Sequence, residues 1–163
     1  MEWFREIKTL VLVFLLQVLL FNHLQIGSWG FPMIYILFLL NLPVRIPRWV
    51  EMLIGVGIGL LMDAWYSSLG VHMAACVMIT FLRPIFLNNM VQDIERIKDN
   101  ICSRTIGARE YTKCVVFLTL IHHFTVYLLE AWSLQNWWII LLQTAISSSM
   151  TLIIILGYDR LNN

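Results

Sequence analysis

The sequence predicts an all-α integral membrane protein, a single compact bundle of six transmembrane helices over residues 1–163. Hydrophobic residues fill 60% of the 163 positions and charged residues 13%, whereas soluble domains average about 45–50% and about 25%. The mean hydropathy is +0.77. A small soluble domain buries only about two-thirds of the surface its unfolded chain exposes. The composition therefore argues against a soluble enzyme, a disordered chain and a nucleic-acid-binding protein.

Six apolar segments approach the ~17–25 residues with which a helix crosses the hydrocarbon core. Basic residues precede the first, but no small-residue cleavage site follows it, so we expect a retained helix rather than a signal peptide. The second has a short apolar core, Met33 to Leu40; Pro32 suits an early helical position, and Pro43 and Pro47 mark the end. The predicted spans are 9–26, 28–44, 48–65, 71–88, 113–132 and 136–158.

The positions of the basic residues test this count, because cytoplasmic loops are enriched in Lys and Arg. With six spans, ten of the 11 basic residues fall on the side of the two termini, and Arg83 lies inside the fourth span. The opposite side, residues 22–31, 63–70 and 132–137, has none. We therefore expect both termini in the cytoplasm. The ten residues are Arg5, Lys8, Arg45, Arg48, Arg96, Lys98, Arg104, Arg109, Lys113 and Arg160.

The third span carries a stripe of small and acidic residues. Glu51, Gly55, Gly59 and Asp63 recur every four residues and share one helix face. Gly55 and Gly59 form a GxxxG pattern, which lets helices approach closely, and Gly57 adds a third glycine. This face predicts either packing within the bundle or a groove for a partner or ligand.

Polar residues on the remaining spans predict a polar seam inside the bundle, because polar atoms in lipid face other helices or a cavity. Arg83 either extends to the headgroups or pairs with Glu51 at the same depth. His123 and Glu130 lie on one face of the fifth span, with Tyr127 between them. The seam residues are Glu51, Arg83, His123 and Glu130.

The fifth span also raises the question of metal binding or proton relay, because histidines are rare within membranes. His122 and His123 are adjacent, so they point about 100° apart on a helix and are poorly placed to bind one ion together. Hydrogen bonding between helices is the simpler interpretation. The sixth span offers Gln143, Ser147 and Thr151 at helical spacing for such contacts.

Residues 89–112 form the one long connection. Apolar residues from Met90 to Ile101 recur at three- and four-residue steps with charged residues between them, and Gly107 ends the pattern. This periodicity predicts an amphipathic helix on the cytoplasmic membrane surface. A docking helix for a cytoplasmic partner is the alternative, and the mixed charge argues against nucleic acid.

The chain contains no motif for catalysis or cofactor binding. A glycine-rich phosphate loop, a GxSxG turn and a zinc signature are all missing from the sequence. Cys76, Cys102 and Cys114 have no paired spacing. We therefore expect no metal and no cofactor.

One stretch resembles a known family. Phe31-Pro32, then Leu42-Pro43-Val44-Arg45, then Gly55-x-Gly57-x-Gly59-x-x-x-Asp63 and Ser68-Leu69-Gly70 resemble MreD, the rod shape-determining membrane protein family. In that family a glycine-rich helix ends in an aspartate, and a short outer turn ends in Leu-Gly. Asp63, Leu69 and Gly70 match this pattern. The motif covers residues 31–85, and elsewhere the similarity is one of hydropathy and size.

The resemblance implies a non-catalytic scaffold of the bacterial elongation machinery in the cytoplasmic (inner) membrane, supporting rod shape and lateral peptidoglycan synthesis. Its expected partner is the bitopic protein MreC, and through it MreB, RodA and a penicillin-binding transpeptidase. The implied fold is similar to the S component of energy-coupling-factor transporters. Asp63 would anchor the outer end of the third span, and the Gly55–Gly59 face would accept a helix of this chain or of MreC.

Two other functions remain open. A true S-component-like protein would bind a vitamin or other small molecule, with Asp63, His72 and Glu130 at the mouth of the site. An intramembrane enzyme would use His123 and Glu130.

Overall fold

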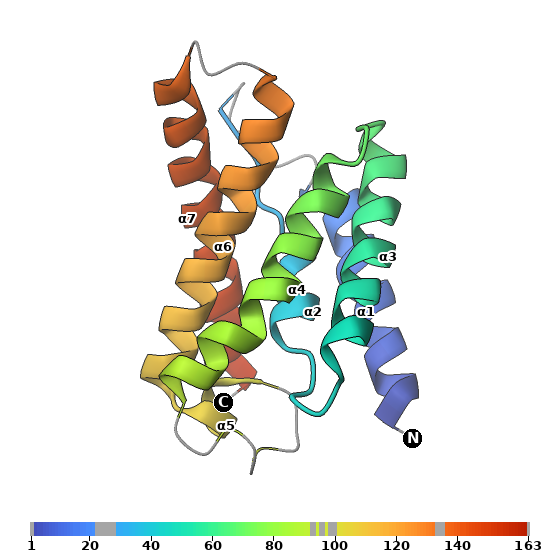
Figure 1. Ribbon diagram of the computed structural model, residues 1–163, viewed down its shortest axis with the longest axis vertical. Helices are drawn as coiled ribbons and strands as arrows, with labels where there is room; N and C mark the ends of the chain where they lie inside the picture. Colours follow the sequence, from blue (N-terminus) through green and yellow to red (C-terminus); the bar gives the residue numbers. More distant parts are fainter. Residues whose placement is uncertain are drawn as a thin grey trace.

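The computed structural model describes residues 2–21, 29–91, 94, 97, 101–132 and 136–162, and these residues form helices joined by turns, with no β-strand among them (Figure 1). The helices are α1 (Glu2–Leu19), α2 (Ile36–Leu40), α3 (Arg48–Tyr66), α4 (Val71–Met90), α5 (Ser103–Ile106), α6 (Ala108–Ala131) and α7 (Trp137–Asn162).

Four of these helices, α3, α4, α6 and α7, are long and apolar enough to cross a membrane. The chain is thus a multi-pass membrane protein, as its composition predicts. The four helices correspond to the predicted spans 48–65, 71–88, 113–132 and 136–158. Helix α6 begins five residues before its predicted start, at Ala108 instead of 113, because it continues directly from the turn at Gly107.

The predicted first span corresponds to α1. Its apolar part, Leu10–Leu19, is shorter than the four helices that are long enough to cross a membrane. The end of the predicted span, beyond residue 21, lies outside the described residues.

The predicted second span is wrong as a continuous helix. Within 28–44 only Ile36–Leu40 is helical, and we call residues 29–47 the crossing segment. It runs through the interior of the bundle, from the end where α6 and α7 are joined to the end where the termini lie (Figure 1). Gly30 starts it with φ +148°, outside the range of other residues. The prolines at 32, 43 and 47 remove amide hydrogens and confine the backbone, which keeps the helix short.

The crossing segment supplies the centre of the core. Every residue from Met33 to Leu40 is at most 9% exposed. Non-helical backbone at membrane depth needs hydrogen-bond partners inside the protein, because lipid provides none. Side chains of the surrounding helices provide them.

At the start of the crossing segment, the partners come from α1 and α7. The Gln17 side chain on α1 donates to the Pro32 carbonyl at 3.0 Å and accepts from the Ile34 amide at 2.7 Å. The Met33 amide donates to Thr151 Oγ1 on α7 at 3.0 Å. One glutamine and one threonine thus satisfy three peptide groups that no helix satisfies.

At the far end of the crossing segment, the partner is Arg83 on α4. Its Nε donates to the Leu40 carbonyl at 3.0 Å, and its Nη2 donates to the Leu42 carbonyl. Nη1 pairs with the Glu51 carboxylate on α3. Arg83 therefore ties the crossing segment to two spanning helices at once.

Helices α3 and α4 form a close antiparallel pair, and the glycine stripe of α3 faces α4. A Cβ on Gly55 would lie 2.8 Å from Thr80 Oγ1, and one on Gly59 would lie 2.3 Å from the Met73 Cα. This face accepts a helix of the same chain and is fully used. Gly57 lies on the opposite, exposed side, and its added Cβ would meet nothing within 4 Å.

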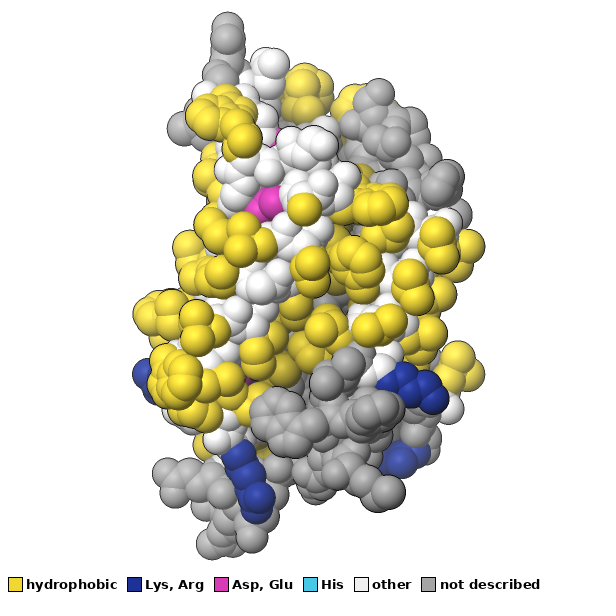
Figure 2. Space-filling view, turned by 90° about the vertical axis from the view of Figure 1, so that its right-hand side faces the viewer, with side chains coloured by type: hydrophobic (Ala, Val, Ile, Leu, Met, Phe, Trp, Pro, Cys, Tyr) yellow, Lys and Arg dark blue, Asp and Glu magenta, His cyan; other side chains and the backbone are white. Residues whose placement is uncertain are grey.

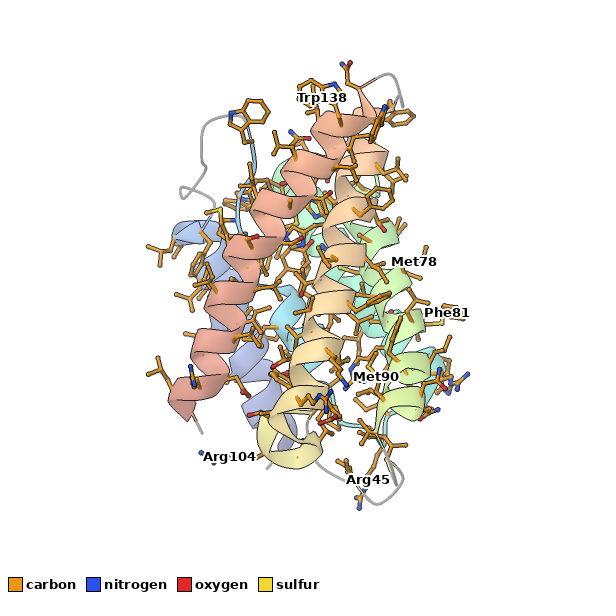
Figure 3. The ribbon with its side chains drawn as sticks, turned by 90° about the vertical axis from the view of Figure 1, so that its left-hand side faces the viewer. Arg45, Met78, Phe81, Met90, Arg104 and Trp138 are labelled. Atoms are coloured by element: carbon orange, nitrogen blue, oxygen red, sulfur yellow. The ribbon has the colours of Figure 1, made fainter. Side chains whose placement is uncertain are left out.

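The outer surface is apolar in the middle and basic at one end. Figure 2, which looks onto the side formed by α1 and α3, shows hydrophobic side chains over most of the face and Lys or Arg only toward one end. Figure 3 shows Arg45 and Arg104 at that end, Trp138 at the other, and Met78 and Phe81 pointing away from the bundle. An apolar surface of this kind suits lipid contact.

The predicted amphipathic helix over 89–112 lies partly outside the described residues. In the described part, α4 continues to Met90 and α5 covers Ser103–Ile106. Ile94, Ile101 and Ile106 are buried. Gly107, with φ +90°, separates α5 from α6, as its place in the sequence indicates.

The two glycine faces of α3 give a matched test. Gly59→Ala should force α3 and α4 apart, because the new Cβ would overlap backbone atoms of α4, and should lower the unfolding midpoint in detergent by several degrees. Gly57→Ala should leave it unchanged or raise it, because alanine favours a helix over glycine by about 0.5–1 kcal/mol. A larger loss for Gly57→Ala than for Gly59→Ala would contradict this packing.

Candidate functional site

Asp63, the acidic residue of the MreD-like motif, lies in the last turn of α3 and binds the first turn of α4. Its Oδ1 accepts from the Ser68 hydroxyl at 2.5 Å and from the His72 amide at 2.9 Å. Its Oδ2 accepts from the Met73 amide at 2.9 Å. The carboxylate is 5% exposed, so these bonds replace water.

This arrangement explains the glycine that follows. Gly70 occupies the N-cap of α4 with φ +81° and has no side chain to bond the free amides of the first turn. Asp63 supplies the missing cap from the preceding helix, and a carboxylate there also suits the positive end of the helix dipole. The anchor expected of Asp63 thus holds the start of α4 as well as the end of α3.

Glu51 and Arg83 form a buried ion pair, 3% and 2% exposed. Of the two interpretations of Arg83 that the sequence left open, the structure supports pairing with Glu51 and not extension to the headgroups. The three guanidinium contacts, one with the carboxylate and two with carbonyls of the crossing segment, use all three of its nitrogens. Such geometry suits a structural clamp.

A second polar cluster lies at the centre of the bundle. The Tyr35 hydroxyl, on the crossing segment, lies 2.8 Å from His72 Nδ1 on α4 and 3.0 Å from His122 Nε2 on α6. The Tyr66 ring stacks on His72 with centroids 5.0 Å apart, and Gln17 donates to the Tyr66 hydroxyl at 3.3 Å.

The number of protons on Tyr35, His72 and His122 determines which hydrogen bonds this cluster can form. The Tyr35 hydroxyl has one proton, so it donates to one imidazole and accepts from the other when both rings are neutral. The outer nitrogens, His72 Nε2 and His122 Nδ1, are buried and have no hydrogen-bond partner among the described residues. One of them is then an unpaired N–H and the other an unpaired lone pair, and these roles are exchanged only if the outer proton changes rings along with the two shared protons.

The predicted seam on α6 divides in the structure. His123 is buried, and its Nε2 shares a hydrogen bond of 3.1 Å with Thr151 Oγ1. This bond joins α6 to α7. Tyr127 contacts Ser147 at 2.5 Å. Glu130 is exposed near the end of α6 and lies outside the buried part of the seam. The interhelical hydrogen bonding expected of these histidines is confirmed.

Sequence reasoning missed several members of the seam. Gln17 is the one polar side chain in the apolar run from Leu10 to Leu20. A polar residue isolated in this way indicates a side chain that faces the interior of the bundle. The sequence named His72 only for a ligand mouth and did not indicate its contact with Tyr35, because that contact joins residues 37 positions apart. Gly30 packs on α6 and α7, where an added Cβ would lie 2.0 Å from Ser147 Oγ.

The residues named for a metal site or a ligand mouth are not brought together. Among the residues that the structure describes, no group of three His, Cys, Asp or Glu side chains is placed to hold a metal ion. Asp63 and His72, two residues of the expected ligand mouth, are buried against the α3–α4 turn, and Glu130 is exposed. Comparisons with protein-family models, curated proteins and solved structures found no match to this chain.

The cap at α4 predicts a graded response at Asp63. Asp63→Leu should lower the unfolding midpoint strongly, because it leaves buried amides unpaired at about 1–3 kcal/mol each. Asp63→Asn keeps one acceptor oxygen and should have a smaller effect, comparable to Ser68→Ala. Thermal unfolding in detergent measures the order; equal tolerance of Asn and Leu would rule out the cap.

The clamp at Arg83 predicts an asymmetric response. Arg83→Gln should destabilise the bundle by about 3–5 kcal/mol, because it strands a buried carboxylate and frees the two carbonyls. Glu51→Gln keeps both carbonyl bonds and should cost less, and the double variant should be more stable than Arg83→Gln alone. Denaturant titration in mixed micelles gives these free energies; additive losses would contradict the coupling.

Proposed function

We propose that this chain is a non-catalytic membrane scaffold of the MreD type, working in the bacterial elongation machinery that maintains rod shape through lateral peptidoglycan synthesis. It binds a bitopic MreC-like protein and reaches MreB, RodA and a penicillin-binding transpeptidase through that partner. It needs no cofactor, and its surroundings are the lipids of the cytoplasmic membrane.

One observation carries the proposal: the residues of the MreD-like motif build a single structural unit. The first part, 31–45, lies within the crossing segment, which Arg83 clamps. The second, Gly55 to Gly70, is the α3–α4 hairpin, closed by Asp63. A motif that maintains architecture rather than a reaction centre supports a scaffold.

The topology of the proposal has six passes with both termini in the cytoplasm. Four are the long helices, and α1 and the crossing segment make the other two. Both termini lie at the same end of the bundle (Figure 1), where Arg45 and Arg104 also lie (Figure 3). The excess of basic residues in cytoplasmic loops then gives the orientation. A compact bundle of this kind is compatible with an S-component-like fold.

The partner's helix binds, on this proposal, the outward side of α3. Leu53 and Leu61 are 59% and 51% exposed, and Gly57 between them leaves a depression with nothing near its Cβ position. Small residues permit close helix approach in membranes. The buried Gly55–Gly59 side is unavailable because α4 occupies it.

A transporter-like function in small-molecule binding is the second candidate. It is favoured by a cavity of about 370 Å³ beside the crossing segment, although His72 and His122 do not line that cavity. It predicts a tightly held, water-soluble small molecule in the purified protein. An empty preparation that binds no candidate vitamin would exclude it.

Depletion and co-purification test the scaffold. Depleting the protein should round the cells, and the tagged chain should co-purify an MreC-like protein in mild detergent. Gly57→Trp should reduce that recovery at least tenfold, because the bulky ring fills the contact. Gly157→Trp on α7, also at an exposed glycine with an open Cβ position, is the matched control and should leave recovery unchanged.

Cells that keep a normal rod shape after complete depletion of the protein would contradict the scaffold function. Equal recovery of the MreC-like protein with Gly57→Trp and Gly157→Trp would show that the partner does not bind the outward side of α3. His123→Ala combined with Glu130→Ala should retain partner recovery, and loss of cell shape with partner binding intact would favour the enzyme.

A further inference from the structure

Three buried histidines surround the crossing segment. His72 on α4 and His122 on α6 meet at the Tyr35 hydroxyl, and His123, the next residue of α6, contacts α7. All three side chains are 0% exposed. The rings of His122 and His123 have centroids 5.6 Å apart, so a positive charge on one of them disfavours a second charge on the other.

The hydrogen bonds of His123 determine which of its nitrogens takes up a proton. Nδ1 lies 2.9 Å from the Thr119 carbonyl, which only accepts, so Nδ1 carries the hydrogen of the neutral ring. Nε2 then has a lone pair, and it lies 3.1 Å from Thr151 Oγ1. In the neutral state the Thr151 hydroxyl donates to this lone pair.

Thr151 has a second acceptor for its one hydrogen. Its Oγ1 also lies 2.9 Å from the Ser147 carbonyl, and it accepts from the Met33 amide at 3.0 Å. When His123 Nε2 gains a proton, the hydroxyl turns to Ser147 and the new N–H donates to Oγ1, which has two lone pairs. Every donor and acceptor of this set therefore has a partner in both states, and no heavier atom has to move.

His72 and His122 offer no such position for a proton. One of their inner nitrogens donates to Tyr35 and the other accepts from it, so an added proton has to go to an outer nitrogen. The outer nitrogens, His72 Nε2 and His122 Nδ1, have no hydrogen-bond partner among the described residues. A buried charge is costly unless it is hydrogen-bonded, which favours His123 over both of them.

The other titratable groups around the three rings do not supply the missing partners. Asp63 lies closest to His72 and attracts a charge there, but both of its oxygens already accept hydrogen bonds. Helix α1 over Leu10–Leu19 and helix α7 over 140–155 carry no titratable side chain. The titratable groups that face the rings are Tyr35 on the crossing segment, Asp63 and Tyr66 on α3, Cys76 on α4, and Tyr127 and Glu130 on α6.

Polar side chains lead toward His123 from the end of the bundle where α6 and α7 are joined. Glu130 is exposed near that end, and Tyr127, one turn closer to His123, shares a hydrogen bond of 2.5 Å with Ser147 on α7. Ser147 lies one turn before Thr151 on the same face of α7. On the topology proposed above, this end of the bundle lies on the side opposite the cytoplasm.

We propose that the three buried histidines bind one proton between them, that His123 Nε2 holds it, and that it enters from the end where Glu130 lies. Binding reverses the hydrogen bond between His123 and Thr151 and places a positive charge beside the start of the crossing segment. The bundle thus changes its internal charge with the acidity of the outer side and keeps the bond that holds the Met33 amide. The site is independent of the scaffold function and of the partner of α3.

Nitrogen NMR of the full chain with isotope-labelled histidine in lipid nanodiscs tests the site, because protonated and unprotonated imidazole nitrogens differ in chemical shift. At about pH 8, His123 should be the tautomer with hydrogen on Nδ1. On acidification to about pH 4, past the usual histidine value of about 6.5, its Nε2 should gain a proton while His72 and His122 stay neutral. Single replacements of each histidine by glutamine assign the signals.

Two results of this titration would overturn the proposal. One is a charge that forms on His72 or His122 before it forms on His123. The other is a His123 ring that stays neutral down to the pH at which the bundle unfolds.

Variants of α7 test the part played by the hydroxyl. Thr151→Val removes the acceptor of the new N–H, so the midpoint for charging His123 should move to lower pH by at least about one unit, roughly a tenfold loss of proton affinity. Thr151→Ser keeps the hydroxyl and should keep the midpoint. Thr144→Val, which removes a buried α7 hydroxyl with no partner among the described residues, is the matched control, and an equal shift in that variant would overturn the assignment.

A measurement on the unaltered chain covers variants that fail to fold. The Met33 amide donates to Thr151 in both states, so its protection factor against hydrogen exchange should be the same above and below the midpoint of His123. Loss of this protection when His123 becomes charged would overturn the reversal of the hydrogen bond in place.

Discussion

Peptide groups that leave a helix inside a membrane need partners from the protein itself, and this need governs the bundle. The crossing segment brings non-helical backbone to the centre of the molecule. Gln17, Thr151 and Arg83 supply its hydrogen bonds from three different helices. Each of these helices is therefore fixed in depth and rotation by a bond to the same strip of backbone. The burial of Gln17, Thr151 and Arg83 follows from this one irregular element.

The α3–α4 hairpin meets the same need for hydrogen-bond partners, here at the start of a helix. A membrane helix beginning at glycine has free amides and no side chain to bond them, and Asp63 reaches across the turn to do so. The glycines of α3 bring the helices near enough for this reach. Close packing and capping are thus coupled, since one sets the separation that the other requires.

Hydropathy predicted what depends on long local patterns. The four long helices and the role of Gly55 and Gly59 in packing follow from spacing and composition, whereas the anchoring by Asp63 was expected only from the family resemblance. The interrupted second span did not, because an apolar run with prolines looks alike whether it forms a short helix at the bilayer or a broken one inside the protein. The contact of Tyr35 with His72 and His122 was also out of reach, since it depends on how distant segments are brought together. Glu130 shows the opposite error, because helical spacing placed it with His123 although it lies beyond the buried seam.

The partners of the crossing segment also constrain the order of biogenesis. Met33 bonds to a residue 118 positions later, and Leu40 to one 43 positions later. When residues 29–47 have just been synthesised, Arg83 and Thr151 have not, and lipid cannot satisfy the exposed peptide groups. The segment must therefore wait, in water or within the insertion machinery, until the last helix arrives. A chain cut short before Thr151 would leave its centre open, which makes completion of α7 the step that commits the protein to its fold.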